Sequence, residues 1–250
     1  QAGYGVEIAA DGYEIKKFSN PNQEQKCVFE PIYFASENSN VFGMNIAKAR
    51  QKLGEMLVRC DNCDNIKADV VIAVPQSGVQ AAIGYTKASN IELVEGLKLK
   101  ENIGRSFILP SQKSREKTVK DKFIIDKNLI KDKKIILIDD SIVRGTTSKE
   151  IIKSLREAGA KEIHLRLSSP MIINSCHWGV DIPNKEELLA FNNSEIQIAE
   201  IIDADSVKFL PLENLKEFFG ETGWCYNCFI QKLGNQKELC DQHTKNQVLA

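Results

Sequence analysis

Two adjacent carboxylates, Asp139 and Asp140, are the residues whose types and spacing point most directly to chemistry. They close a short aliphatic run at 135–138, and such a run is typical of a strand buried on both faces in a parallel sheet. Acids at the carboxyl end of a buried strand lie at the edge where open α/β sheets bind ligands. A carboxylate pair at this edge suits a sugar diol or a magnesium ion.

A loop of small and hydroxyl residues follows the acids, from Ser141 to Ser148, and Gly145 gives its backbone conformational freedom. The spacing of Thr147 and Glu150 predicts a capping box, and the apolar positions after them predict a helix with one buried face. Free N–H groups at a helix start, with a glycine and hydroxyls, form an anion pocket. The residues alone also allow an ordinary acidic turn before a capped helix.

Polar residues also follow a second predicted strand, at 70–74, which ends in Pro75, Gln76, Ser77 and Gly78 before a helix pattern begins. Carboxyl ends of parallel strands share one edge of a sheet, so Ser77 is a candidate to join the acids. A simple Ser-Gly turn is the alternative on local grounds.

The full string from Asp139 to Ser148, DDSIVRGTTS, resembles the phosphoribosyl-diphosphate (PRPP) binding loop of type I phosphoribosyltransferases, in its amidophosphoribosyltransferase version. The resemblance runs from about Cys27 to Phe229. The segment at 74–78 is similar to the family's VPDSG, with Gln76 where an acid is usual. The implied fold is α/β, the type I phosphoribosyltransferase fold with a mainly parallel sheet flanked by helices, which the alternating strand and helix patterns also indicate.

The long basic stretch at 96–122 is similar to the family's flexible loop. Lys and Arg in such a stretch suit a lid over a polyanionic substrate, while a solvated loop is the alternative. The segment from Leu99 to Asn102 departs from the family's Lys-Asn-Arg-Tyr, and Glu101 brings an acid into it. This departure leaves open a catalytically impaired PRPP-binding or regulatory relative.

The resemblance implies an enzyme that converts PRPP and ammonia, normally from glutamine, to 5-phosphoribosylamine and pyrophosphate, the first step of de novo purine biosynthesis. The implied catalytic residues are Asp139, Asp140 and Arg105. Ser77, Asp139 and Asp140 would hold Mg²⁺. The implied substrate-binding residues are Ser77, Gly78, Lys100, Gln112, Ser141, Arg144, Gly145, Thr146, Thr147 and Ser148.

Seven cysteines suggest a reducing compartment such as the cytoplasm, with free or metal-binding thiols. The pair Cys60 and Cys63 alone reads as free surface thiols. By the resemblance, a four-iron, four-sulfur (4Fe-4S) cluster is held by Cys27, Cys176, Cys225 and Cys228. Thiolates are the soft ligands that iron–sulfur chemistry requires.

A net charge of −1 gives no electrostatic footprint for nucleic acid, and no apolar run approaches the roughly 20 residues that span a membrane. The resemblance implies three parts: a remnant of an amino-terminal glutaminase domain with its linker (1–26), a phosphoribosyltransferase domain (27–220) and a cysteine-containing tail that packs on the core (221–250). The resemblance implies a glutaminase domain or chain as partner, and a homo-oligomer. Salvage of a purine base is disfavoured, because the matching residues follow the amidotransferases.

The remaining patterns predict further elements. Residues 1–18 predict a β-hairpin that turns at Asp11 and Gly12, and the aromatic segment from Cys27 predicts a strand. Apolar spacing predicts helices over 45–59, 195–202 and 212–219 and a helix that begins at 183–189. Residues 161–168 predict a strand, in which His164 is interpreted as a sheet-surface or packing histidine rather than a catalyst.

Overall fold

The computed structural model describes residues 3–18, 25–61, 66–100, 123–176, 178–181 and 184–230. Its centre is a four-stranded parallel sheet in the order β11 (Ser206–Phe209), β10 (Glu162–Leu167), β9 (Lys134–Asp139) and β6 (Val70–Ala73). The register places Leu167 beside Asp139 and Ala73 beside Ile138, so β6, β9 and β10 finish along one edge. Every residue of β9 after Lys134 is buried, as an inner strand of a parallel sheet requires.

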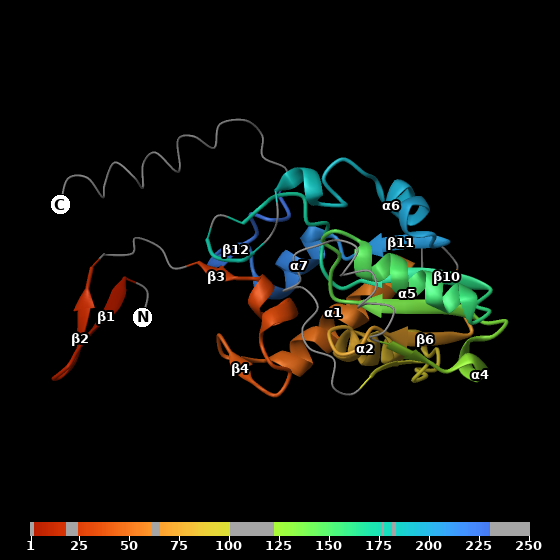
Figure 1. The fold of residues 1–250 in the computed structure, drawn as a ribbon, viewed down its shortest axis with the longest axis horizontal. Coiled ribbons are helices and arrows are strands. Elements are labelled where there is room, and N and C mark those ends of the chain that lie inside the picture. The colour runs from red at the N-terminus through yellow and green to blue at the C-terminus, as the bar shows by residue number, and fades with distance from the viewer. Residues whose placement is uncertain are drawn as a thin grey trace.

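Helices cover both faces of this sheet (Figure 1). On one face, α1 (Ile46–Asp61), α2 (Val79–Ser89) and α7 (Leu212–Phe219) share a core with Ile136 and Ile138. On the other face, α5 (Thr146–Glu157) and α6 (Glu195–Ile202) share a core with Ile135 and Leu137. The alternation of Ile135 to Ile138 between two cores explains why this strand is apolar at every position.

The described residues form four two-stranded pairs besides this sheet. The hairpin β1 (Tyr4–Ala9) and β2 (Gly12–Lys17) lies apart from the sheet in Figure 1. The parallel pair of β3 (Lys26–Cys27) and β12 (Trp224–Cys225) joins distant parts of the chain. The antiparallel pairs are β4 (Asn40–Val41) with β5 (Met44–Asn45), and β7 (Leu97–Leu99) with β8 (Phe123–Ile125), which the short helix α4 (Lys127–Ile130) follows.

The structure confirms the α/β architecture, the hairpin and the helices predicted over 195–202 and 212–219. The strand predicted from Cys27 is wrong beyond its first residue, because Glu30–Phe34 forms a π-helix, η1, with Pro31 in its first turn. The helix predicted from 183–189 is only a 3-10 turn, η3 (Lys185–Glu187). Strand β11 was not predicted, since its four residues SVKF carry too little periodicity.

The strand containing His164 also differs in burial from an alternating pattern. Both His164 and Arg166 are buried, although they lie on the face of β10 where alternation would place exposed residues. Arg166 is wholly buried and bonds Asp61 at the end of α1 through its Nε, at 2.5 Å, and Tyr85 of α2 donates to the same carboxylate.

Within the described residues, no helix combines the length and apolar character that a membrane crossing needs.

Candidate active site at the carboxyl edge of the sheet

The two acids lie at the end of β9 in a buried setting, with Asp139 7% and Asp140 3% exposed. The Oδ1 atom of Asp139 accepts hydrogen bonds from the Ser77 hydroxyl and from the Asp140 N–H, both at 2.8 Å. The Oδ1 atom of Asp140 accepts from the Ser141 hydroxyl at 2.9 Å. The Oδ2 atom of Asp140 is buried and has no hydrogen-bond partner among the described residues.

Burial, and next the charge of Asp139, raise the pKa of the Asp140 carboxyl well above its ordinary value. The hydrogen bond from Ser141 and the charge of Arg50 act in the opposite direction. Arg50 is itself buried in α1 and donates to the backbone oxygens of Pro31 and Ala35. An orphaned carboxylate oxygen beside a second carboxylate and a hydroxyl is a set of hard oxygen donors, and this set fits a magnesium ion.

Ser77 reaches the acids because Gly78 lets its loop lie directly on β9. A Cβ atom at Gly78 would lie 2.2 Å from the Ile138 carbonyl oxygen, so no other residue fits there without movement. Backbone bonds from Val74 N–H to the Ile138 oxygen and from Gly78 N–H to the Val74 oxygen hold the turn. Gly78, expected to bind substrate, thus has a visible steric role in bringing Ser77 to Asp139.

The loop after the acids ends at the start of α5, where Gly145 is the N-cap residue with a left-handed backbone (φ 76°). The predicted capping box is wrong, because the helix begins at Thr146 and its first N–H groups receive no side-chain cap. This correction matters for binding. Uncapped N–H groups at a helix start are available to an anion, and the helix dipole favours negative charge there. Thr146, Thr147 and Ser148 occupy this first turn.

The structure does not bring all predicted residues together in the same way. The Arg144 guanidinium points to Glu187 of η3, which it bonds at 2.9 Å. Lys100 is exposed just after β7. Arg105 and Gln112, predicted for the lid, lie outside the described residues. Glu187 and Leu189, which contact the loop, were missed because an irregular segment has no periodicity to mark it.

The four cysteines predicted to hold a cluster come from three separate segments. Cys27 and Cys225 are register partners in the β3–β12 pair. The backbone oxygen of Cys228 accepts from the N–H groups of Ile173 and Asn174, two residues before Cys176. Burial raises the pKa of the Cys228 thiol, and the charges of the other three cysteines add to that rise. No group of three or more His, Cys, Asp or Glu side chains in the described part of the chain is arranged to hold a metal ion.

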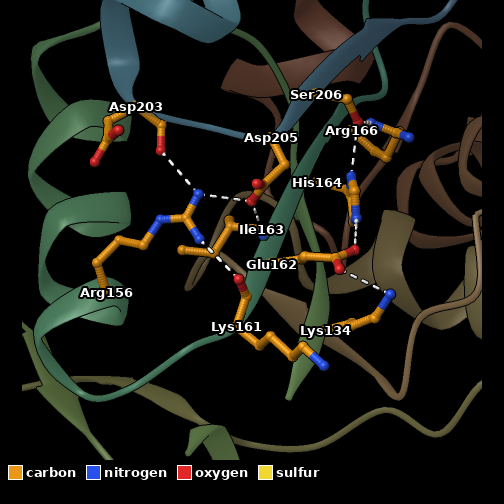
Figure 2. A network of polar contacts seen from close by, with 10 residues as sticks. All are labelled: Lys134, Arg156, Lys161, Glu162, Ile163, His164, Arg166, Asp203, Asp205 and Ser206. Carbon is orange, nitrogen blue, oxygen red and sulfur yellow. Dashed lines mark hydrogen bonds and ion pairs between the residues drawn. The ribbon is translucent and has the colours of Figure 1, made fainter. Parts of the chain in front are cut away.

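The opposite, amino-terminal edge of the sheet carries a network of ion pairs (Figure 2). Arg156 of α5 bonds Asp205 at 2.6 Å, and the same carboxylate oxygen accepts from the Ile163 N–H. Lys134 bonds Glu162 at 2.7 Å. The His164 ring contacts the Ser206 hydroxyl at 2.9 Å and lies near Glu162. In the pairs Arg156–Asp205 and Lys134–Glu162 a cation meets a carboxylate, and we therefore interpret this edge as structural.

The fold and the site together define a phosphoribosyltransferase. A phosphoribosyl transferase domain is matched over residues 44–168, which include both acids and the whole loop to Ser148. The chain therefore belongs to the phosphoribosyltransferase domain family.

Within this family the chain is similar to amidophosphoribosyltransferases, as the loop sequence predicted. It is 44% identical to the chloroplastic amidophosphoribosyltransferase of Vigna aconitifolia, over 87% of this chain and 45% of the relative. It is 38% identical to the Bacillus subtilis amidophosphoribosyltransferase, over 97% of this chain and 52% of the relative. The chain thus spans about half the length of these curated relatives.

A solved structure supports the same assignment. The glutamine PRPP amidotransferase of B. subtilis, complexed with ADP and GMP, superposes with a TM-score of 0.76 at 39% identity. The match covers 92% of this chain and 51% of that chain. The predicted type I phosphoribosyltransferase fold and the predicted resemblance are both confirmed.

Proposed function

We propose that this chain transfers the phosphoribosyl group of PRPP to ammonia, giving 5-phosphoribosylamine and pyrophosphate at the entry to purine biosynthesis. The bond from the ribose C1 to the pyrophosphate oxygen breaks, a C1–N bond forms, and the nitrogen then loses a proton to solvent. The similarity to proteins named amidophosphoribosyltransferase supports this reaction. The observation that carries it is the buried pair Asp139–Asp140 beside the uncapped start of α5.

The residues have separate tasks in this proposal. Asp139 and Asp140 accept hydrogen bonds from the ribose hydroxyls, and the N–H groups from Gly145 to Ser148 bind the 5-phosphate. Because neutral ammonia already carries a lone pair, catalysis needs positioning and charge stabilisation rather than a strong base. Arg105 and Gln112, which lie outside the described residues, would belong to a lid over the substrate, and Lys100 precedes that segment in the sequence.

Magnesium is part of the proposal, with Ser77, Asp139 and Asp140 as the residues that would hold it. The ion supplies positive charge to the leaving pyrophosphate. The orphaned Oδ2 of Asp140 and the Asp139 carboxylate offer oxygen ligands at the carboxyl end of β9. This donor chemistry supports magnesium over a soft metal.

The test is anaerobic turnover of PRPP with magnesium and ammonium, measured as pyrophosphate release. Wild-type protein should release pyrophosphate only when ammonium is present, and the double variant Asp139→Asn, Asp140→Asn should not. Glu150→Gln, which removes one carboxylate charge farther along α5, serves as the control for loss of a nearby charge and should keep wild-type turnover. Release that persists in the double variant would refute the assignment of the acids.

A second candidate is a PRPP-binding or regulatory relative with impaired catalysis. The observation that favours it is Leu99 to Asn102, which departs from the family's basic and aromatic residues and brings in Glu101. Tight binding of PRPP without pyrophosphate release would establish this alternative. Restoring Lys-Asn-Arg-Tyr at 99–102 should then restore turnover.

We further propose that Cys27, Cys176, Cys225 and Cys228 hold a 4Fe-4S cluster. The β3–β12 register and the backbone bonds to Cys228 support the proposal, because they join the three segments that carry these thiols. Bound iron deprotonates a coordinating thiol and would overcome the raised pKa of Cys228. Anaerobic reconstitution should give iron and labile sulfide in equal amounts, with Cys228→Ser losing both and Cys60→Ser losing neither. Full iron content in Cys228→Ser would contradict the proposal.

The remaining features of the proposal concern partners and location. Ammonia would come from glutamine through a glutaminase domain or chain, and the protein would be a homo-oligomer in the cytoplasm. Among the described residues, Cys27, Cys176, Cys225 and Cys228 form no disulfide bonds, which supports a reducing compartment. Sedimentation of the chain, alone and with a glutaminase, tests the assembly. Glutamine-dependent turnover by this chain alone would contradict the proposal that a glutaminase partner supplies the ammonia.

A further inference from the structure

A short segment, Lys185–Ala190, crosses the carboxyl edge of the sheet directly over the loop that carries Arg144 and Gly145; we refer to it as the strap. Its two buried residues lie in different cores. Leu188 packs in the core shared with α1 and α2, and Ala190 packs in the core shared with α5 and α6. The strap is therefore anchored on both faces of the sheet while Leu189, between these anchors, meets the loop.

Leu189 makes the closest contacts. Its N–H donates to the Val143 carbonyl at 2.8 Å. Its side chain covers Gly145, since a Cβ atom added at that glycine would lie 2.5 Å from the Leu189 Cδ2 atom. Its own carbonyl accepts from the Asn193 Nδ2 atom at 2.8 Å. Both backbone groups of Leu189 are thus fixed, and its side chain closes one side of the left-handed turn that begins α5.

Glu187 supplies a second, charged contact to the same loop. Its carboxylate bonds the Arg144 Nε atom at 2.9 Å, and both side chains are partly exposed, 50% and 41%. Such a pair contributes little to global stability in water. The pair does hold the Arg144 guanidinium on the strap. The loop is thus held by the Leu189 hydrogen bond to Val143, the ion pair at Arg144 and the Leu189 side chain at Gly145.

We infer that the strap positions the 5-phosphate-binding loop, with Glu187 and Leu189 as positioning residues that set the turn at Gly145 for the phosphate. The inference rests on the proposed function, because it assumes that this loop binds the 5-phosphate of PRPP. It also changes the role of Arg144. Its side chain acts through Glu187, and the backbone N–H groups of the loop contact the phosphate.

The test compares two probes by calorimetry on the full chain: ribose 5-phosphate, which needs the loop, and magnesium pyrophosphate, which binds at the acids. Glu187→Gln should raise the Kd for ribose 5-phosphate by about 2–5-fold, the range of an exposed ion pair, and leave the Kd for pyrophosphate unchanged. Leu189→Ala should raise the first Kd further, by about tenfold or more, because the turn loses its packing. A merely structural defect would weaken both probes together.

Glu186→Gln is the matched control, since this neighbouring carboxylate is exposed, makes no ion pair with other described residues, and gives the same change of charge. It should bind both probes as the wild type does. Parallel thermal unfolding shows that each variant is folded under the binding conditions.

A double-mutant cycle distinguishes an indirect role of Arg144, through Glu187, from direct binding of the phosphate by Arg144. If Arg144 acts through Glu187, then Arg144→Gln, Glu187→Gln and the double variant should show the same Kd for ribose 5-phosphate. Additive losses would mean that Arg144 binds the phosphate directly, and tighter binding by Glu187→Gln would mean that Glu187 competes with the phosphate; either result overturns the inference. Wild-type protein that binds neither PRPP nor ribose 5-phosphate would refute the proposed function as well.

Discussion

The two edges of the parallel sheet differ in how their charged side chains are paired. At the amino-terminal edge, Arg156 meets Asp205 and Lys134 meets Glu162, so carboxylates face cations (Figure 2). At the carboxyl edge, Asp139 and Asp140 are adjacent in sequence and buried, and one oxygen of Asp140 lacks a hydrogen-bond partner among the described residues. Like charges in a buried setting cost stability, and such costs persist where a site needs them for a ligand.

This difference shows which part of the protein is arranged for stability and which for binding. Arg50, whose charge favours ionised Asp140, donates hydrogen bonds to the backbone oxygens of Pro31 and Ala35. At the carboxyl edge the buried Oδ2 atom of Asp140 lacks a hydrogen-bond partner among the described residues and can therefore accept positive charge from a ligand. We therefore expect changes at one edge to affect activity and changes at the other to affect stability.

The largest effect is expected for Asp140→Asn. Turnover of PRPP should fall by about 10²–10³-fold, because a preorganised charge at the reacting centre is lost. The free energy of unfolding should rise by about 0.5–2 kcal/mol, since a buried like-charge pair is removed. Pyrophosphate release and urea unfolding measure the two quantities. A destabilised variant would show that Asp140 is structural and would remove the contrast between the edges.

Asp205→Ala tests the opposite edge. It removes the partner of Arg156 and the acceptor of the Ile163 N–H, so the free energy of unfolding should fall by about 1–3 kcal/mol. Turnover per folded molecule should stay at the wild-type value. Asp205→Asn keeps an acceptor for the Ile163 N–H without the charge, so its free energy of unfolding should lie between those of the wild type and Asp205→Ala. A loss of turnover in folded Asp205→Ala would show that the two edges are coupled.

His164 should make the stability of the fold depend on pH. Burial, and next the charge of Arg166, lower the pKa of this imidazole, against the opposing effects of Glu162 and Asp205. Near the ordinary histidine pKa, the unfolded chain therefore binds a proton at His164 more readily than the folded chain does. The free energy of unfolding is retained above this pH range and falls as the pH drops through it. Urea unfolding between pH 8 and pH 5 should show that His164→Gln loses less free energy of unfolding than the wild type does. Equal losses would assign the dependence to other groups.

The smallest effect is expected for Lys134→Gln. Its ion pair with Glu162 is partly exposed to solvent, and such pairs contribute little to stability. The urea midpoint should not shift measurably, and turnover should be unchanged. A clear loss of stability would show that the network of Figure 2 acts as a unit rather than as separate pairs.

The sequence by itself determined the features that rest on local pattern. The aliphatic run before Asp139 specifies a buried strand, and the string DDSIVRGTTS specifies the loop and the family. Helices α6 and α7 were predicted from apolar spacing alone. Local patterns suffice here because each element buries one periodic face whatever its partners are.

Only the tertiary structure decided the contacts between segments that have no pattern in common. The partners Ser77 and Asp139 are 62 residues apart, and Asp61 and Arg166 are 105 residues apart. Aromatic residues suggested a strand, but Glu30–Phe34 forms a π-helix. Arg50 of α1 donates hydrogen bonds to the Pro31 and Ala35 carbonyls there, a contact between distant segments that local pattern does not record. The strap meets Gly145 for a similar reason. Its place depends on two cores that exist only when the sheet has formed, so no local spacing of residues records it.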